Sequence, residues 1–154
     1  MSEAVHYETL EEEANHVISE SRMVLPGVQT ILGFQLVAVF NQRFELFARN
    51  EQILHFTAFF LTAAAMGLIM APAAYHRQAE RRCVSRRFVD TASRLLTISM
   101  VPFLTGICLD TFLVGRLVFD SREMSLVATM ALFLFLAGIW FGLPFLVRNR
   151  PVRR

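Results

Sequence analysis

The 154-residue sequence contains no lysine, and all fifteen of its basic side chains are arginines. It has only two cysteines, Cys83 in an arginine-rich segment and Cys108 in an apolar run, so neither a disulfide framework nor a zinc-ligand spacing is present. It also lacks a nucleophile elbow, a phosphate-binding loop, an HExxH sequence and a glycine-rich phosphate cradle. We therefore expect no enzymatic activity, no cofactor and no metal site.

Three further features are absent: a secretory signal, aromatic residues within the basic segments, and the alternating pattern of a β-barrel. The first residues are acidic, so the basic start and apolar run of a cleaved secretory signal are missing. The basic segments lack interleaved aromatic residues, and we expect no binding to nucleic acid. Alternating segments of about ten residues, which would indicate a membrane β-barrel, are absent as well.

Long apolar runs dominate the sequence instead. Hydrophobic residues make up 55% of the chain and the mean hydropathy is +0.46. At about 1.5 Å per residue, a helical run of some 20 residues crosses a hydrocarbon core of about 30 Å. The sequence predicts an all-α integral membrane four-helix bundle whose spans are residues 23–40, 53–75, 95–119 and 124–147.

The predicted membrane domain, residues 23–147, is flanked by two charged segments. Residues 1–22 carry six acidic side chains and one arginine, and their apolar residues recur at helical spacing, which predicts an acidic, amphipathic cytoplasmic helix. Residues 148–154 form a basic tail, also predicted to be cytoplasmic. Pro26 stands near the start of the first apolar run, a position where proline is tolerated.

Arginines near the span ends predict the orientation. The segment 77–87 carries five arginines and the tail 148–154 carries four, whereas the other two connections hold few. Because basic residues mark the cytoplasmic side, we expect both termini and this loop in the cytoplasm, in contact with anionic lipid head groups, and the chain in a bacterial inner membrane.

A weak internal similarity appears when the sequence is shifted by 72 residues. Glu51 then falls on Glu123, and Pro72 falls on Pro144, at equivalent places of the first and second pairs of spans. Two parallel-repeat helical hairpins, related by an axis along the membrane normal, would give this pattern. Chance similarity between apolar segments with basic ends would give it too.

Asp110 is an ionisable residue in the middle of the third predicted span. Helical turns place it on one face with Gly106, Phe103 and Ser99, a face suited to helix contact, so we expect it to point into the bundle or an oligomer interface. An acid in a span is costly and is a candidate functional site. One interpretation is cation binding or proton relay, and the other is a structural role in which Asp110 is hydrated or paired with an arginine.

Other polar residues fall into two groups. Gln29 and Gln35 lie in the first span, where they would either join helices by hydrogen bonds or line a wet cavity. Arg116 is predicted to extend its side chain to the outer head groups. The remaining candidates are interfacial, and their histidines are expected to be solvated: Arg22, His55, His76 and Arg77.

The acidic N-terminal segment and the arginine-rich segments are predicted on the same side of the membrane. We hypothesise that residues 8–21 form a helix that docks across the cytoplasmic mouth of the bundle, with Leu10, Ala14 and Val17 facing it. Exposed ion pairs contribute little on their own, so docking also requires this apolar stripe. A solvated acidic tail is the alternative.

The stretch ESRMVLPGVQTILGFQL, followed by QRF and by APAAYHR, resembles a family of small bacterial four-span membrane proteins of unknown function. The resemblance covers about residues 10–147 and implies a polytopic helical fold in a bacterial inner membrane. It implies no established activity. The residues that carry it are Arg22, Leu25-Pro26-Gly27, Gln29, Gly33-Phe34, Pro72 and His76-Arg77.

Two functions are compatible with these features. The first is an oligomeric protein that conducts or transports ions or protons, using Asp110 and the glutamines of the first span. The second is a non-catalytic scaffold or accessory subunit of a membrane complex. In both cases we expect the lipid bilayer and a homo-oligomer or larger complex as partners.

Overall fold

The computed structural model describes residues 9–79, 83–119 and 121–148 of the chain. These residues form helices and short connections, and no strand occurs among them. In chain order the elements are α1 (Leu10–Val39), the 3₁₀ helix η1 (Gln42–Leu46), α2 (Arg49–Ala79), α3 (Arg86–Phe119), α4 (Arg122–Ala137), the π-helical turn η2 (Gly138–Gly142) and α5 (Leu143–Arg148).

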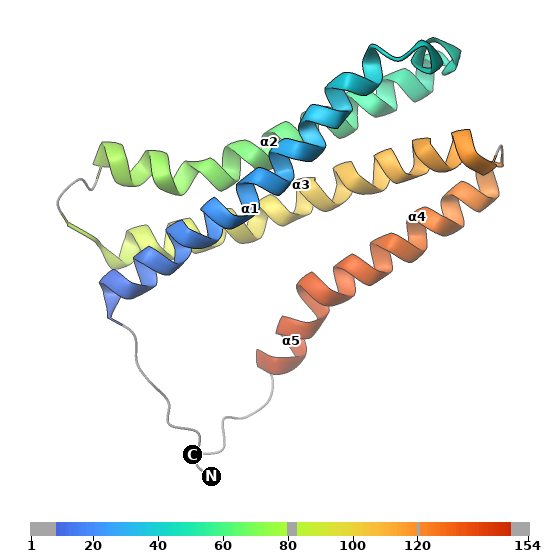
Figure 1. The fold of residues 1–154 in the computed structure, drawn as a ribbon. Coiled ribbons are helices and arrows are strands. Elements are labelled where there is room, and N and C mark those ends of the chain that lie inside the picture. Colours follow the sequence, from blue (N-terminus) through green and yellow to red (C-terminus); the bar gives the residue numbers. More distant parts are fainter. Residues whose placement is uncertain (1–8, 80–82, 120, 149–154) are drawn as a thin grey trace.

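The helices run alternately up and down (Figure 1). The start of α1, the end of α2 and the start of α3 lie at one end of the molecule, and η1 lies at the opposite end with the turn between α3 and α4. In the described part of the chain, four helices are long and apolar enough to cross a membrane: α1, α2, α3 and the stretch Arg122–Val147. The predicted all-helical, four-helix architecture is confirmed.

The predicted N-terminal amphipathic helix and the first predicted span form one continuous helix, α1. It begins at a capping box, in which Thr9 accepts from the backbone N–H of Glu12 and the Glu12 carboxylate accepts from the backbone N–H of Thr9. Pro26 therefore lies well inside α1, a position tolerated in membrane helices. One set of buried residues continues through both segments, so the bundle holds the helix as a unit.

That set has a heptad spacing. Ala14, Ser21, Val28 and Gln35 are buried along α1, each seven residues after the last. The same pattern recurs in the two neighbouring helices. In α2 the buried residues are His55, Ala58, Thr62, Ala65, Ile69 and Pro72, and in α3 they include Ala92, Ser99, Gly106 and Leu113. Alternating steps of three and four residues are typical of helices that pack with a small left-handed crossing angle.

Two glycines set how closely α3 approaches its neighbours. A Cβ on Gly106 would lie 2.8 Å from Thr62 Oγ1 and 3.1 Å from the Ala58 carbonyl oxygen of α2. A Cβ on Gly115 would lie 3.1 Å from Ser125 Cβ of α4. A Cβ at Gly106 would force its neighbours to shift, and a Cβ at Gly115 would make an unusually tight contact, so the two glycines allow the close approach of the helices.

The helix α4 buries fewer of its residues than α1, α2 and α3 do. Ser125 is its buried residue, and it lies against Gly115 near the start of the helix. Further along, α4 diverges from the bundle (Figure 1), and a stacked ring pair, Trp140 of η2 with Phe103 of α3 at 6.1 Å between centroids, supplies contact there. Its exposed face is apolar, as expected for a surface that meets lipid.

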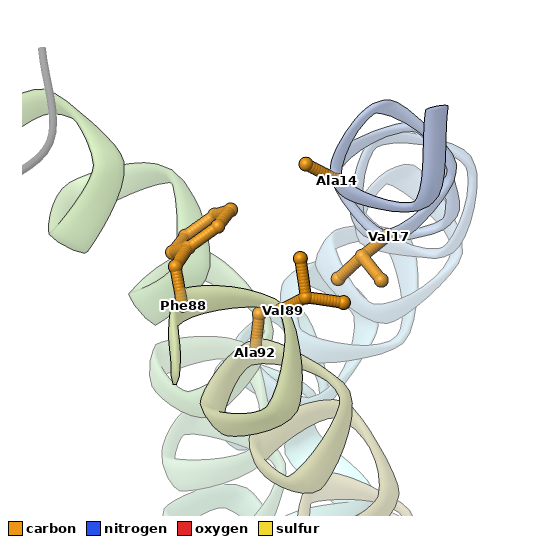
Figure 2. Packing of buried hydrophobic residues seen from close by; sticks show 5 residues of the cluster. All are labelled: Ala14, Val17, Phe88, Val89 and Ala92. Atoms are coloured by element: carbon orange, nitrogen blue, oxygen red, sulfur yellow. The ribbon is translucent and has the colours of Figure 1, made fainter. Parts of the chain in front are cut away.

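The first turns of α1 dock onto the start of α3. Figure 2 shows Ala14 and Val17 of α1 facing Phe88, Val89 and Ala92 of α3, and all five are buried. The docked residues are those predicted from the apolar stripe.

An ion pair joins the same two segments. Arg86 Nη1 lies 2.7 Å from Glu13 Oε2, with the arginine side chain 65% exposed. The predicted geometry differs in one respect: the segment lies along the bundle as part of α1, since the helix does not break at residue 22.

The two hairpins differ where they turn. Nine residues including η1 connect α1 to α2, whereas two residues separate α3 from α4. The up-and-down arrangement is the one that parallel repeats would have, and duplication of a hairpin stays a prediction.

Candidate functional site

Three helices bring polar side chains together near the η1 end of the bundle. Gln35 comes from the last quarter of α1, His55 from the second turn of α2, and Asp110 from the final third of α3. Gln35 is 4% exposed and His55 is 7% exposed, while the Asp110 side chain is 23% exposed. The helix heptads explain the convergence, because Gln35 and His55 occupy the core positions of α1 and α2.

The Gln35 amide joins all three helices. Its Nε2 donates to Asp110 Oδ2 at 2.5 Å and to Thr62 Oγ1 at 3.2 Å. The Thr62 hydroxyl donates to the Ala58 carbonyl at 3.0 Å, so its oxygen is free to accept from Gln35. Both neighbours of Nε2 are thus acceptors, which fixes the orientation of the amide. Gln35 Oε1 is left buried without a hydrogen-bond partner.

The His55 ring lies between two acceptors. Its Nε2 lies 2.9 Å from the backbone carbonyl oxygen of Gln35, and its Nδ1 lies 3.4 Å from Asp110 Oδ1. A carbonyl oxygen can only accept, so Nε2 carries a hydrogen. The Phe44 ring of η1 packs edge-on against the imidazole, with 5.3 Å between centroids. Together these contacts hold the ring with Nδ1 directed at the carboxylate.

A cavity of about 390 Å³ reaches this group of residues from the η1 end. Gln35, His55 and Asp110 contribute its polar wall, and Asn41 and Arg43 lie where the chain leaves α1. Its apolar side chains include Ile31, Phe34, Phe44, Phe47, Leu113 and Leu117. A mostly apolar pocket with a few convergent polar groups is the usual form of a small-molecule site.

Arg116 is placed differently from the prediction. We expected its side chain to extend to the outer head groups, but its Nε lies 3.2 Å from Glu51 Oε1 at the start of α2. The pair is partly buried, with 32% and 21% of the two side chains exposed. Glu51 lies within reach because α2 begins beside the end of α3. The Arg116 guanidinium therefore pairs with Glu51 and does not extend to the head groups.

The predicted interfacial residues separate into two places. Arg22, His76 and Arg77 line one hollow at the other end of the bundle, together with Ile18 and Met70. The two halves of the sequence motif quoted above thus meet in space. The predicted solvated position of His55 is wrong, because this residue is buried and paired.

Gln29 is exposed on the outside of α1 and does not belong to the polar group. Gln35 has the helix-joining role that the sequence offered for both glutamines.

Sequence reasoning missed His55, Thr62 and Glu51 as partners of the predicted residues. A signal was present for all three. His55, Thr62 and Ile69 repeat every seven residues through a run rich in alanine, so they share one face of α2. Glu51 carries the same signal, because Ala58, Ala65 and Pro72 follow it at steps of seven residues on the buried face of α2.

The described residues bring together no group of three or more histidine, cysteine, aspartate or glutamate side chains that could hold a metal ion. The arrangement instead offers a carboxylate, an imidazole and an amide beside an apolar cavity. These groups can bind a proton or an organic cation, and they can donate or accept hydrogen bonds from a small ligand.

The fold and the polar group define a class: a helical protein with four helices suited to crossing a membrane and an ionisable site between three of them. The chain belongs to the family of unknown function DUF6328, which it matches over residues 4–144. Neither the comparison with curated proteins nor that with solved structures gives a match.

Proposed function

We propose that this protein is a multi-pass protein of the bacterial inner membrane that binds and transfers protons at the His55–Asp110 pair, as part of an ion- or proton-transport activity. The observation that carries the proposal is the 3.4 Å approach of His55 Nδ1 to Asp110 Oδ1 between membrane-type helices. An intramembrane ionisable residue with an identified partner is a candidate functional site, and proton relays are among the roles that such residues have.

A count of hydrogens supports proton binding. Since Nε2 of His55 holds the hydrogen that meets the Gln35 carbonyl, Nδ1 either carries a second hydrogen or presents a lone pair to Asp110. Two lone pairs facing each other repel, whereas one proton between them makes an attractive contact. The pair therefore accommodates one proton, on either the imidazole or the carboxyl, and its loss leaves a net negative charge.

The His55–Asp110 pair is accessible from one end of the bundle, which supports proton exchange with one side of the membrane at a time. The cavity reaches Asp110 and His55 from the η1 end. In the other direction Ala58, Thr62 and Ala65 have no exposed surface, because Gly106 lets α3 pack tightly against α2. In this conformation the pair exchanges protons with the η1 side, and passage to the other side requires the α2–α3 contact to open.

The orientation of the cavity follows from the arginine distribution. We propose that the arginine-rich connection between α2 and α3 and both termini face the cytoplasm. The η1 end, and with it the cavity, then faces the periplasm, from which a membrane potential that is negative inside drives protons inward.

Proton flux into proteoliposomes tests the proposal. With a pH-sensitive dye inside the vesicles and an imposed potential, the native chain should give a flux that Asp110→Asn abolishes. Asp90→Asn is the matched control, because it makes the same change on the same helix at a side chain that is 57% exposed and outside the site. Equal flux from the native chain and Asp110→Asn would contradict the proposal.

A scaffold or accessory subunit is the second candidate, and the loose attachment of α4 favours it. The most apolar 18-residue window of Arg122–Val147 has none of its residues buried within the chain. This face is available to another copy or to another membrane protein. If Asp110→Asn changes the size of the purified assembly and the native chain carries no proton flux, the structural role of Asp110 and the scaffold function are favoured.

A further inference from the structure

The cavity next to the proton site has more apolar wall than a proton requires. Its volume of about 390 Å³ lies in the range of sites for small organic ligands. Phe34, Phe44 and Phe47 contribute aromatic rings, and the Phe44 and Phe47 rings pack edge to face with 5.8 Å between centroids. Aromatic faces attract cations as well as apolar groups.

The polar wall selects for positive charge and for N–H donors. Among the described side chains that line the cavity, Asp110 is the one carboxylate. Beside it stands the Gln35 amide, whose Oε1 is buried and lacks a donor. The amide cannot satisfy this oxygen by flipping, since Nε2 already serves the acceptors Asp110 Oδ2 and Thr62 Oγ1. The partly exposed Asp110 carboxylate is therefore the acceptor that the cavity offers to an incoming N–H group.

We propose that the cavity binds an apolar organic ammonium ion, and that its binding expels the proton held by His55 and Asp110. The inference rests on the proton site proposed above. The ammonium group takes the place of the shared proton at the Asp110 carboxylate, while Gln35 Nε2 keeps its hydrogen bonds to Asp110 and Thr62. The apolar body lies against the phenylalanine rings and Leu117.

The exchange balances in atoms and charge. Before binding, the pair is an imidazolium and a carboxylate with one shared proton, so its net charge is zero. The incoming ammonium ion adds one positive charge. The ammonium–carboxylate pair that forms is neutral, the imidazole is neutral, and one proton leaves. No bond other than that of the transferred proton is broken.

The neighbouring charges leave Asp110 available. Glu51 and Arg116 form an ion pair with each other. Arg43 of η1 lines the cavity and Arg49 of α2 lines an adjacent hollow beside His55, but both side chains are exposed where salt screens them. Arg43 opposes an incoming cation weakly from the rim, so Arg43→Gln should tighten cation binding severalfold.

Calorimetry on the full chain in nanodiscs tests the inference, with 2-phenylethylammonium as the probe. Titrations in two buffers of different ionisation enthalpy count the protons released. We expect about one proton released per cation bound, and an affinity that rises by up to about tenfold per pH unit between pH 6 and pH 8, because protons compete for the same carboxylate. The neutral 2-phenylethanol and the anionic phenylacetate are the ligand controls.

Three variants separate the possible results. Asp110→Asn should weaken cation binding by about 10- to 100-fold, the factor expected for loss of a charge-assisted hydrogen bond. His55→Gln should keep cation binding but lose most of the linked proton release. If Asp110→Asn does not fold, the predicted gain in Arg43→Gln and the preference for the amine over the alcohol carry the test.

Equal affinity for the amine and the alcohol, or binding without proton release, would overturn the inference. Absence of amine binding would overturn it as well. None of these three results decides the proton site itself, because the flux assay with Asp110→Asn uses no amine. Loss of that flux together with absent amine binding would retain the proposed function and reject this ligand class.

Discussion

Two polar contacts join α1 to α3, one at each end of the helix pair, and they differ in almost every physical respect. Near the start of α1, Glu13 meets Arg86 at 2.7 Å on the surface. Near its end, Gln35 meets Asp110 at 2.5 Å among buried groups. At the first end an apolar cluster lies beneath the charges, whereas at the second end the polar groups are themselves the core.

The comparison teaches where a polar contact contributes to stability and where it serves another purpose. An exposed pair can be removed with little change, because water replaces the lost partner. A buried network has no such replacement, so each group depends on the others. A bundle held by small residues alone would not need Gln35, His55 and Asp110. Their presence at one end of the bundle is therefore the main structural argument for a function there.

The largest effect is expected at the helix contact beneath the network. Gly106→Ala would place a Cβ 2.8 Å from Thr62 Oγ1 and 3.1 Å from the Ala58 carbonyl oxygen, so the Thr62 side chain or the helix backbones must shift. Overpacking of this kind typically costs about 1–3 kcal/mol. Thermal unfolding in detergent should show a clear loss, whereas Gly138→Ala, with no atom within 4 Å of the added carbon, should be neutral. Equal stability of the two variants would show that the α2–α3 approach is looser than described.

Gln35→Ala should come next. It leaves Asp110 and Thr62 without their amide donor, and an unsatisfied buried group costs about 1–3 kcal/mol. Gln29→Ala is the control on the same helix, because Gln29 is exposed. Chemical unfolding should give a clearly lower stability for Gln35→Ala than for Gln29→Ala. Similar values would mean that the network does not stabilise the site end of α1.

A smaller effect is expected at the opposite end of α1. Val17→Ala removes two methyl groups from the cluster with Phe88 and Val89, which should cost about 1 kcal/mol or somewhat more. The free energy of unfolding should decrease while proton flux is unchanged, since this residue is far along α1 from Gln35. Loss of flux without loss of stability would indicate that the two ends are coupled.

The smallest effect is expected for the surface ion pair. Glu13→Gln should leave the unfolding temperature nearly unchanged, because the apolar cluster beneath holds α1 in place. Spin labels at residues 12 and 83 measure the docking directly. We expect a short distance that lengthens little between about 0.05 and 1 M salt, where the Debye length falls to about 3 Å. A distance that becomes long and broad at high salt would show that charge, and not the cluster, holds the segment.

The sequence was sufficient to predict the four long helices and the inward orientation of the Asp110 side chain. Apolar runs of sufficient length leave little choice in a membrane, because each span must satisfy its own backbone. The stripe of Ala14 and Val17 also predicted the docked face of α1. The end of the first predicted span, residue 40, lies within one residue of Val39, where α1 ends.

The missed features depend on contacts between helices, which a single sequence does not encode directly. His55 was expected to be solvated because it stands at the edge of an apolar run. The structure buries it, since α2 begins at Arg49, two turns before, and carries His55 inward. The composition changes from polar to apolar near residue 22, but this change does not alter the helical phase, so one buried face continues through both segments of α1.

Nitrogen-15 NMR of labelled histidine side chains in the full chain is the most direct test of the central claim that His55 and Asp110 share a proton. His55→Phe identifies the signals of this ring. The account predicts a protonated Nε2 and an Nδ1 signal that shifts in Asp110→Asn but stays unchanged in Asp90→Asn. An unprotonated Nε2, or an Nδ1 signal that ignores the loss of the Asp110 carboxylate, would contradict it.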